Sequence, residues 1–263
     1  MPEIAEVEIM ARQLHGWTQG RSLVAVDAPD PAFSGRCWSV LTGRGVQSVS
    51  RRGKYALTNF EGGLTLVIHY RMTGKTVLDA ERCRRARAWF DFDEGCVVAF
   101  VDTRRFGTLD IVATASLGDW FDAKGLGPEP WPQRRSAAWW RDQIGGVRSP
   151  IKVAMMRQDR VAGLGNIAAT EILFRAGIHP ARRPNTLSGT DWTRIAAAVP
   201  AFIAHTIAEE GGDEIRYVNQ GGEGSFAVYG KAGLPCGRCG GAITRMVQSG
   251  RGTYLCPTCQ PLG

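Results

Sequence analysis

The first twenty residues have the hydrophobic spacing of an amphipathic helix. Apolar side chains recur at intervals of three and four residues, at Val7, Met10, Ala11, Leu14 and Trp17. Gly20 follows at the point where such a helix would end. Carboxylates at Glu3, Glu6 and Glu8 lie in or just before the first turn, where the helix dipole favours negative charge. The pattern predicts an N-terminal helix with an acidic start.

From about residue 21 to residue 113 the pattern changes to short β-branched and aromatic runs separated by glycine-containing turns. These runs predict strands at Ser22–Ala28, Val46–Ser50, Tyr55–Phe60, Leu64–Tyr70, Ala88–Phe92, Val97–Asp102 and Thr108–Val112. Residues 61–63 and 93–95 are typical of hairpin turns. Because consecutive strands follow one another without intervening helices, the region predicts a sandwich or barrel rather than a parallel sheet.

Three prolines within five positions, at Pro128, Pro130 and Pro132, mark a candidate linker. The pattern after it is helical. It predicts helices over 137–144, from Pro150 to about residue 158 with Ser149 as the N-cap, over 168–176, and over 191–210. With 263 residues the chain is long enough for two domains, and the order of elements predicts an α+β protein.

Charge and composition narrow the class of partner. The chain has 32 Lys and Arg against 25 Asp and Glu, a net charge of +7 that favours an anionic partner, nucleic acid first. No stretch of about 18 apolar residues occurs, so no transmembrane helix and no membrane partner are expected. The first residues lack the basic and apolar regions of a secretory signal, so a cytoplasmic protein is expected.

Four of the seven cysteines form the strongest local pattern. Cys236, Cys239, Cys256 and Cys259 make two CxxC pairs separated by sixteen residues, which is the spacing of a zinc ribbon. The pattern predicts one structural Zn²⁺, which would supply much of the folding energy of so short a segment. Arg251 lies between two glycines in the connecting turn, where it is either a phosphate ligand or a solvated side chain.

The N-terminus carries a second candidate chemistry. Removal of Met1 would expose the secondary amine of Pro2, and an α-amine titrates near 8, well below lysine. Such an amine condenses with an aldehyde to an iminium, which draws electrons from the adjacent carbon. Glu3 and Glu6 would lie beside it on one helical face as general acid and base. Acidic first turns are also common as helix caps.

Basic residues follow several predicted strands. They occur in 51–55, 69–75 and 102–107, mixed with Met and Phe, as expected for phosphate contacts and apolar wedges between bases. Arg82, Arg84, Arg85 and Arg87 are interpreted as a solvated charge run without a specific role. The glycine turn at 163–165 precedes a helix and indicates a phosphodiester contact rather than a nucleotide-binding loop.

These motifs occur in one order along almost the whole chain. They are Met1-Pro2-Glu3 with Glu6-Val7-Glu8, Gly53-Lys54-Tyr55, His69 with Met72-Thr73-Gly74, Asp102 with Arg104-Arg105-Phe106-Gly107, 126–130, 163–167, and the four cysteines with Arg251. Together they resemble the formamidopyrimidine-DNA glycosylase family, which also contains endonuclease VIII. The resemblance implies a β-sandwich with an N-terminal helix, a helix–two-turns–helix domain and a β-hairpin zinc ribbon, holding DNA in a cleft. The implied domains are a catalytic domain over 1–125, a DNA-binding domain over 126–232 that includes the linker and a lesion-capping loop, and the ribbon over 233–263.

The resemblance also implies an activity and the residues that carry it. The enzyme would be a monomeric DNA glycosylase and AP lyase of base excision repair, acting on duplex DNA with damaged bases or abasic sites by β,δ-elimination. Pro2 would be the nucleophile, with Glu3, Glu6 and Lys54 as the other catalytic residues. Met72, Arg104 and Phe106 would fill the space that the flipped base leaves. Lys152, Asn166 and Arg251 would bind DNA near the lesion.

Three positions depart from the family pattern. Ala5 and Ala168 stand where a proline and a tyrosine are usual, and the capping segment 220–225 is short and mostly glycine. The substrate therefore stays open between ring-opened purines with 8-oxoguanine and oxidised pyrimidines. Two other classes are a catalytically silent DNA-damage-binding relative and a non-enzymatic zinc-ribbon protein. The retained Pro2, Glu3, Glu6 and Lys54 argue against the first class, and the N-terminus argues against the second.

Overall fold

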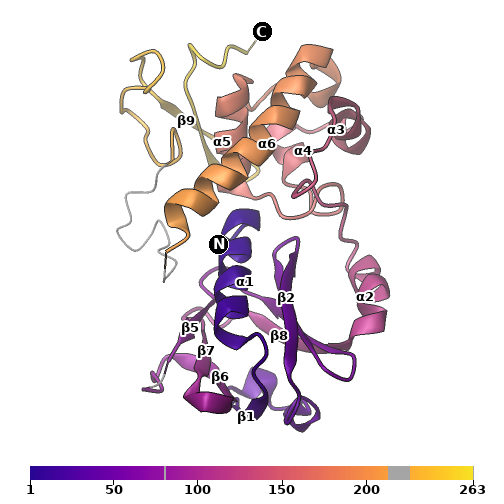
Figure 1. Ribbon diagram of the computed structural model, residues 1–263. Coiled ribbons are helices and arrows are strands. Elements are labelled where there is room, and N and C mark those ends of the chain that lie inside the picture. Colours follow the sequence, from indigo (N-terminus) through magenta and orange to yellow (C-terminus); the bar gives the residue numbers. More distant parts are fainter. Residues whose placement is uncertain (80, 213–225, 263) are drawn as a thin grey trace. The chain divides into compact units, whose positions relative to one another are not determined.

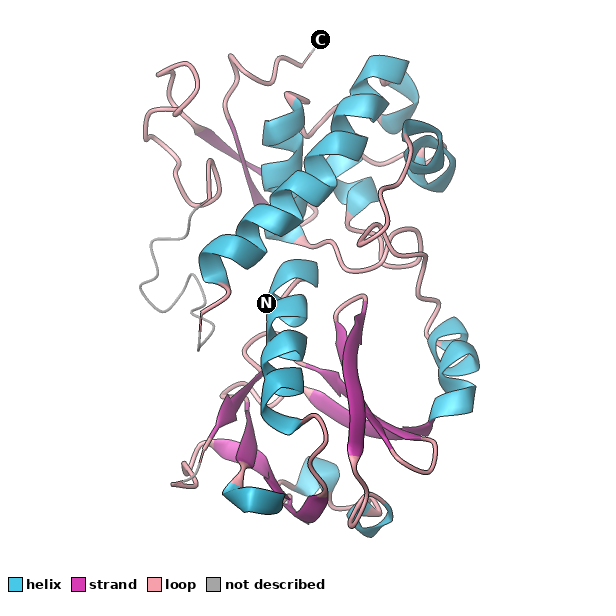
Figure 2. Ribbon diagram, viewed as in Figure 1, coloured by secondary structure: helices cyan, strands magenta, loops and turns pink. Residues whose placement is uncertain are grey.

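The computed structural model describes residues 1–79, 81–212 and 226–262, and the chain forms two compact units. The strand-rich unit comprises Met1–Lys124 and 210–212, and the helical unit comprises Gly125–Glu209 and 226–262. Figure 2 shows strands concentrated in the first unit and helices in the second. The capping segment 220–225 lies outside the described residues.

The N-terminal helix α1 (Ile4–Thr18) forms where the hydrophobic spacing predicts it. Ile4, Val7, Met10 and Leu14 are all buried. The helix begins at Ile4 because Glu3 is its N-cap and Glu6 completes a capping box with it. Helix α1 lies beside strand β2 (Val46–Arg52) in Figure 1, and Val49 N–H donates to His15 Nδ1 across this contact at 3.3 Å.

The predicted β-sandwich is confirmed by two four-stranded antiparallel sheets in the described residues. The first sheet has the order β1 (Leu23–Asp27), β6 (Ala86–Phe92), β7 (Val97–Val101) and β5 (Lys75–Leu78). The second has the order β2, β3 (Tyr55–Phe60), β4 (Leu64–His69) and β8 (Thr108–Ala113). The predicted turns at 61–63 and 93–95 connect β3 to β4 and β6 to β7.

Strand β5 and helix α2 (Leu117–Ala123) are not predicted from the sequence. Strand β5 has four residues, directly after a loop rich in basic and small side chains, so its pattern is too short to separate from that loop. It forms because β7 offers it a full register, from Lys75 opposite Val101 to Leu78 opposite Val98. Both elements depend on tertiary partners rather than on local periodicity.

The helical unit contains α3 (Ala137–Ile144), α4 (Ile151–Met155), α5 (Asn166–Ala176) and α6 (Gly189–Glu210), followed by the hairpin strands β9 (Thr244–Gln248) and β10 (Arg251–Leu255). The predicted bounds of α4 are wrong at both ends. Pro150 rather than Ser149 is the N-cap, and the helix ends at Met155. Gln158 Nε2 donates to the carbonyls of Met156 and Leu164 at 2.9 and 2.7 Å, so its side chain stabilises a loop there.

Within the described residues, no helix combines the length and the apolar character that crossing a membrane requires.

Candidate functional site

The start of α1 brings the predicted N-terminal site residues together. Pro2 is buried, and Glu3 and Glu6 are only 4% and 8% exposed. Glu3 N–H donates to Glu6 Oε2 at 2.9 Å, and the Glu3 side chain accepts the N–H of Glu6 in return. These reciprocal bonds fix both carboxyl groups next to Pro2. The Pro2 nitrogen becomes an amine only when the Met1 peptide bond is cleaved.

Burial, and after it the charge of Glu3, raises the pKa of Glu6 from 4.5 to about 7. The folded state therefore holds this proton more tightly than the unfolded state, and Glu6 lowers stability as the pH rises from about 4.5 to about 7. We expect Glu6→Gln to gain stability over the wild type across this window, on the order of 3 kcal/mol, because one pKa unit corresponds to about 1.4 kcal/mol. Urea unfolding at pH 4, 6 and 8 measures the difference. Glu81→Gln, at an exposed position, is the control, and a pH-independent difference for Glu6→Gln would contradict the expectation.

Arg51 connects α1 to the turn that carries Lys54. Its side chain is only 3% exposed, its Nε lies 3.2 Å from Glu8 Oε2, and its Nη1 donates to the carbonyl of Gly53 at 2.9 Å. Gly53 has a φ of 58°, the positive value that the first central position of a two-residue hairpin loop requires. This ion pair, in which Arg51 is buried and Glu8 partly exposed, therefore holds the loop of Gly53 and Lys54 against the helix whose start carries Pro2. Glu8 and Arg51 were not among the predicted site residues.

Strand register gathers the other predicted residues of this unit at one end of the second sheet. Tyr55 lies opposite His69, and His69 lies opposite Thr108. Lys54 directly precedes Tyr55, and the loop with Met72 follows His69. The loop with Arg104 and Phe106 precedes Thr108. Lys54, Met72, Arg104 and Phe106 therefore all come from the same end of the second sheet.

The pKa of His69 shows that positive charges lie at this end of the sheet. Burial, followed by the positive charges of Arg71 and Lys54, lowers the pKa of His69 to about 3. Its Nδ1 accepts the N–H of Arg71 at 3.0 Å, and its ring packs on Tyr55 with centroids 4.5 Å apart. His69 is therefore a neutral structural residue at physiological pH, and Lys54 supplies positive charge next to it.

Met72 and Phe106 are the exposed apolar side chains of the two loops. They are 39% and 55% exposed, although apolar side chains of this size are usually buried. The guanidinium of Arg104 stacks over the Phe106 ring at 5.0 Å. The cation of Arg104 and the apolar side chains of Met72 and Phe106 thus lie at the end of the sheet that also carries Lys54.

The interpretation of Arg82–Arg87 as a solvated run is wrong for Arg87. Its side chain is 4% exposed, and its Nε donates to Asp30 Oδ2 at 2.6 Å while its Nη1 donates to Asp102 Oδ2 at 3.4 Å. Burial would raise the pKa of Asp30, but hydrogen bonds from Arg87, the Ala32 N–H and Arg105 lower it to about 2. A buried charged network therefore lies directly behind the exposed loop.

In the helical unit, Lys152 and Asn166 contact each other. Lys152 is 1% exposed, and its Nζ donates to Asn166 Oδ1 at 2.6 Å and to Thr253 Oγ1 at 2.7 Å. Asn166 Nδ2 donates to the carbonyl of Gly252 at 3.0 Å. Asn166 is the first residue of α5, after the predicted glycine turn, and Gly252 is adjacent to Arg251. The structure thus brings Lys152 and Asn166 into one cluster, and the hairpin strand that carries the exposed Arg251 contacts this cluster through Gly252.

Glu171 is a further residue of this cluster that sequence reasoning did not find. It is fully buried in α5, and its carboxylate accepts the N–H groups of Ala227, Val228 and Tyr229 at 2.8–2.9 Å. Asn166 Nδ2 in turn donates to the Tyr229 hydroxyl at 3.4 Å. Glu171 therefore fixes a loop residue beside Asn166. Only the fold shows this, because the carboxylate and its partners are more than fifty residues apart.

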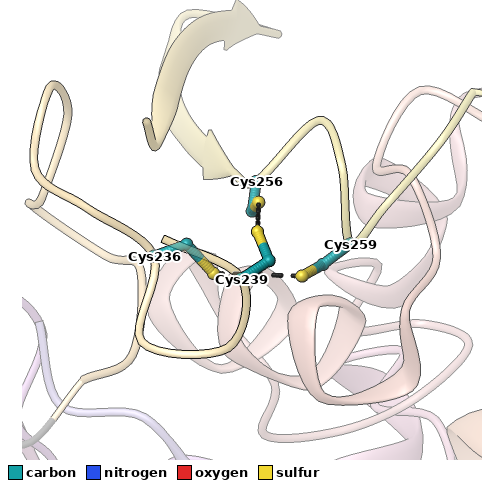
Figure 3. Close-up of side chains that lie close together, drawn as sticks. All are labelled: Cys236, Cys239, Cys256 and Cys259. Atoms are coloured by element: carbon teal, nitrogen blue, oxygen red, sulfur yellow. Dashed lines mark hydrogen bonds between the residues drawn. The ribbon is translucent and has the colours of Figure 1, made fainter. Parts of the chain in front are cut away.

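The four predicted metal ligands converge on one point. The Sγ atoms of Cys236, Cys239, Cys256 and Cys259 all lie within 4.8 Å of one another, and their side chains point toward a common centre in Figure 3. The Sγ atoms of Cys236 and Cys259 are 3.9 Å apart, and those of Cys239 and Cys256 are 3.4 Å apart. Tetrahedral Zn²⁺ with Zn–S bonds of about 2.3 Å needs S–S distances of about 3.8 Å. The donor set and its size fit one structural Zn²⁺.

The hairpin β9–β10 joins the two CxxC pairs. Ser249 and Gly250 form its turn with φ of 48° and 74°, and Arg251 is the first residue of β10, opposite Gln248. Arg251 thus follows the turn rather than forming part of it, and its side chain is exposed. Cys236 and Cys256 are buried in a cluster with Phe174, Val228 and Ile243, so the metal site also fixes the hairpin on α5.

Three family models match the chain. The formamidopyrimidine-DNA glycosylase N-terminal domain matches residues 1–109, and the H2TH domain of the same glycosylase matches residues 126–217. The zinc finger found in formamidopyrimidine-DNA glycosylase and isoleucyl-tRNA synthetase matches residues 233–262. The strand-rich N-terminal part, the helical part and the zinc ribbon are therefore each matched by a separate family model.

Similar whole proteins carry the same name. The formamidopyrimidine-DNA glycosylase of Acidiphilium cryptum is 38% identical, over 99% of this chain and 100% of that protein. The structure is similar to Lactococcus lactis Fpg bound to DNA with an abasic site, with a TM-score of 0.88 and 30% identity over 98% and 99% of the two chains. A complex of that protein with DNA containing N7-benzyl-Fapy-dG gives a TM-score of 0.89 and 31% identity over 99% and 100% of the chains.

Proposed function

The chain belongs to the formamidopyrimidine-DNA glycosylase family, and from this premise we propose how its own residues perform the reaction. It is a base excision repair enzyme, a DNA glycosylase with AP lyase activity, and its partner is DNA with damaged bases or abasic sites. The observation that carries the proposal is the position of Pro2, Glu3 and Glu6 at the start of α1, which Arg51 ties to the turn with Lys54.

We propose that Pro2 is the nucleophile after Met1 is removed. The amine attacks C1′ of the damaged nucleotide, the C1′–N bond breaks, and its electron pair leaves with the base, which takes up a proton. The amine hydrogen is released as a proton, so the nitrogen lone pair completes an iminium as the C1′–O4′ bond opens. Loss of the C2′ proton expels the 3′ phosphate, and loss of the C4′ proton expels the 5′ phosphate. Water hydrolyses the remaining iminium and returns the amine.

The neighbouring side chains supply protons and charge. Glu3 lies beside Pro2 and protonates O4′ as the sugar ring opens. Glu6 holds the backbone of Glu3 through its 2.9 Å hydrogen bond and so fixes the direction of that acid. Lys54, on the turn that Arg51 holds, neutralises a phosphate next to the reacting sugar. Borohydride treatment of the enzyme with abasic DNA and with a panel of base lesions tests the proposal, since it reduces an iminium to a stable covalent bond.

We propose that Met72, Arg104 and Phe106 occupy the space that the flipped nucleotide leaves. Unstacking a base costs a few kcal/mol, and inserted side chains offset part of this cost. The exposure of Met72 and Phe106 and the stacking of Arg104 on Phe106 support this role. Arg104, as the cation of the set, would hydrogen-bond the orphaned base opposite the lesion.

We expect Phe106→Ala to slow base release from duplex DNA about tenfold or more, because base–aromatic stacking contributes about 1–3 kcal/mol. Cleavage of a pre-formed abasic site should change little, since no base has to be unstacked there. Single-turnover rates on both substrates measure the difference. Leu78→Ala, at a similarly exposed apolar position on β5, is the control. Equal losses of the two activities in Phe106→Ala would contradict the proposed role.

For the helical unit we propose that Asn166 and Arg251 hold the phosphates around the lesion and that the buried Lys152 contributes to DNA binding from behind them. Asn166 begins α5, where backbone N–H groups favour an anion, and Arg251 is exposed beside it on β10. Lys152 supports them through its bonds to Asn166 and Thr253. We propose that the chain divides into a catalytic domain over 1–125, a DNA-binding domain over 126–232 and a zinc ribbon over 233–263.

We propose ring-opened formamidopyrimidines and 8-oxoguanine as the substrates. The relative of known structure that binds a formamidopyrimidine in DNA matches this chain over almost its whole length, which supports the assignment. We also propose that the enzyme acts as a monomer in the bacterial cytosol, in line with its bacterial relatives. Base release from matched duplexes with formamidopyrimidine, 8-oxoguanine or an oxidised pyrimidine tests the choice of lesion, and a clear preference for the pyrimidine would overturn it.

A further inference from the structure

Arg87 is a buried cation at an irregularity of the first sheet. In the pairing of β6 with β7, Ala86 lies opposite Val101 and Ala88 opposite Phe100, so the register shifts at Arg87. Such a bulge re-aims the side chain of the extra residue. Here it directs the guanidinium onto the ring of Phe33, 4.4 Å from the centroid, and toward the loop that follows β7.

The loop that follows β7 comprises residues 102–107, and we call it the wedge loop. Arg87 contacts the carboxylate of its first residue, Asp102, and the carbonyl of its last residue, Gly107. Its Nη1 lies 3.4 Å from Asp102 Oδ2 and 3.0 Å from the carbonyl of Gly107. Asp102 itself is 1% exposed and accepts the N–H of Gly107 at 2.7 Å and that of Arg104 at 3.2 Å. The loop is therefore closed on one buried carboxylate, and Arg87 holds its two ends together.

The end of the wedge loop is closely packed at Gly107. A Cβ added at Gly107 would lie 2.5 Å from Cζ of Phe100. Arg105 has a φ of 57°, a left-handed conformation that costs energy for a residue with a side chain. Its guanidinium lies 3.0 Å from Asp30, the same carboxylate that accepts from Arg87 Nε at 2.6 Å. The sharp turn at Arg105 thus lets its guanidinium reach the buried Asp30 from the surface, since the Arg105 side chain is exposed like those of Arg104 and Phe106.

The same network reaches the second loop. Thr73 Oγ1 donates to Asp102 Oδ1 at 2.5 Å and accepts the N–H of Arg104 at 3.2 Å. Thr73 directly follows Met72. Asp102 therefore couples the loop with Met72 to the loop with Arg104 and Phe106, and Arg87 neutralises the charge of Asp102 from the interior.

We propose that Arg87 is a positioning residue for base extrusion, which acts through Asp102 and Asp30 to hold Met72, Arg104 and Phe106 in the arrangement that enters the DNA stack. The proposal rests on the function proposed above. It assigns no chemical step to Arg87, so the iminium chemistry at Pro2 proceeds without it. A purely structural ion pair would instead stabilise the unit without favouring one substrate over another.

Arg87→Lys tests the proposal, because lysine keeps one buried positive charge between Asp30 and Asp102 but lacks the guanidinium geometry that contacts Asp30, Asp102 and Gly107 together. We expect base release from a duplex lesion to slow about tenfold, the factor that a lost charge-assisted hydrogen bond corresponds to. Cleavage and borohydride trapping of pre-formed abasic DNA should stay within about twofold. The melting temperature shows that the variant is folded. Arg82→Lys is the matched control, since Arg82 pairs with Asp91 on the surface of the same unit.

A second variant tests the same network without altering a buried charge. Thr73→Val preserves the shape of the side chain and removes only the hydroxyl between Asp102 and Arg104. We expect the same selective loss. A double-mutant cycle that combines Arg87→Lys with Phe106→Ala should be strongly non-additive. Arg87→Lys should add little to the loss once the ring that Arg87 positions is absent.

The outcomes separate this inference from the proposed function. Wild-type enzyme that fails to be trapped on abasic DNA would contradict the proposed function itself. Normal wild-type trapping with equal losses of both activities in Arg87→Lys and Thr73→Val, or with unchanged base release in both variants, would overturn the positioning role. Additive effects in the cycle with Phe106→Ala would do the same.

Discussion

An N-terminal extension that cannot be removed is expected to abolish both base release and strand cleavage. In the extended protein the Pro2 nitrogen is an amide, which is neither basic nor able to form an iminium with C1′. Lys54 and the ribbon stay intact, so the protein should still bind abasic DNA with nearly normal affinity. Activity assays on lesion-containing and abasic duplexes, together with binding to an uncleavable abasic analogue, measure both expectations.

The same peptide added after Gly263 is the matched control for this extension and should leave both activities unchanged. Pro2→Gly gives a graded comparison, because removal of Met1 there exposes a primary amine. That amine should form an imine and retain reduced activity. Full strand cleavage by the N-terminally extended protein would contradict the role of Pro2 and would make Lys54 the first alternative to test.

Loss of the zinc site should have the second largest effect. Cys256 is buried, its Sγ lies 3.4 Å from that of Cys239, and it packs in the cluster that holds the hairpin on α5. We expect Cys256→Ser to release the metal, because structural zinc binding contributes on the order of 10 kcal/mol to the folding of such segments. The hairpin then no longer places Gly252 against Asn166 and Lys152, and affinity for DNA should fall by at least about tenfold, since phosphate contacts dominate that affinity.

Metal analysis and DNA titrations of the purified variant check this expectation. Cys37→Ser, at an exposed cysteine of the strand-rich unit, is the control and should retain one zinc per chain. Arg251→Ala should weaken DNA binding with the zinc retained, which separates the role of the arginine from that of the hairpin. Wild-type protein with well under one zinc per chain and an intact fold would contradict the structural role of the metal.

The sequence predicts most elements of this fold because their signals are local. The strand runs, the turns at 61–63 and 93–95, and helices α1, α3, α5 and α6 are confirmed near their predicted bounds. The four cysteines are equally local, since two CxxC pairs specify a metal site without reference to the fold. Strand β5 and helix α2 are missed because each is short and depends on neighbours that are distant in sequence.

The site residues that sequence reasoning missed share one property. Arg87 is fifty-seven residues from Asp30 and fifteen from Asp102, and nothing near it in sequence distinguishes it from the exposed Arg84 and Arg85. Arg51 and Glu171 likewise act through partners forty or more residues away. Motifs therefore identify the residues proposed to meet DNA, whereas only the packed structure identifies the residues that hold them in place.

Borohydride trapping on abasic DNA, followed by mass mapping of the linked peptide, tests the central claim most directly. The attachment is expected on the N-terminal peptide that begins with Pro2, with a mass that shows one reduced deoxyribose linkage. Glu3→Gln keeps the amine, so it should be trapped at the same peptide while releasing a damaged base severely more slowly. Attachment to a lysine-containing peptide such as the one with Lys54, with Pro2 unmodified, would contradict the claim.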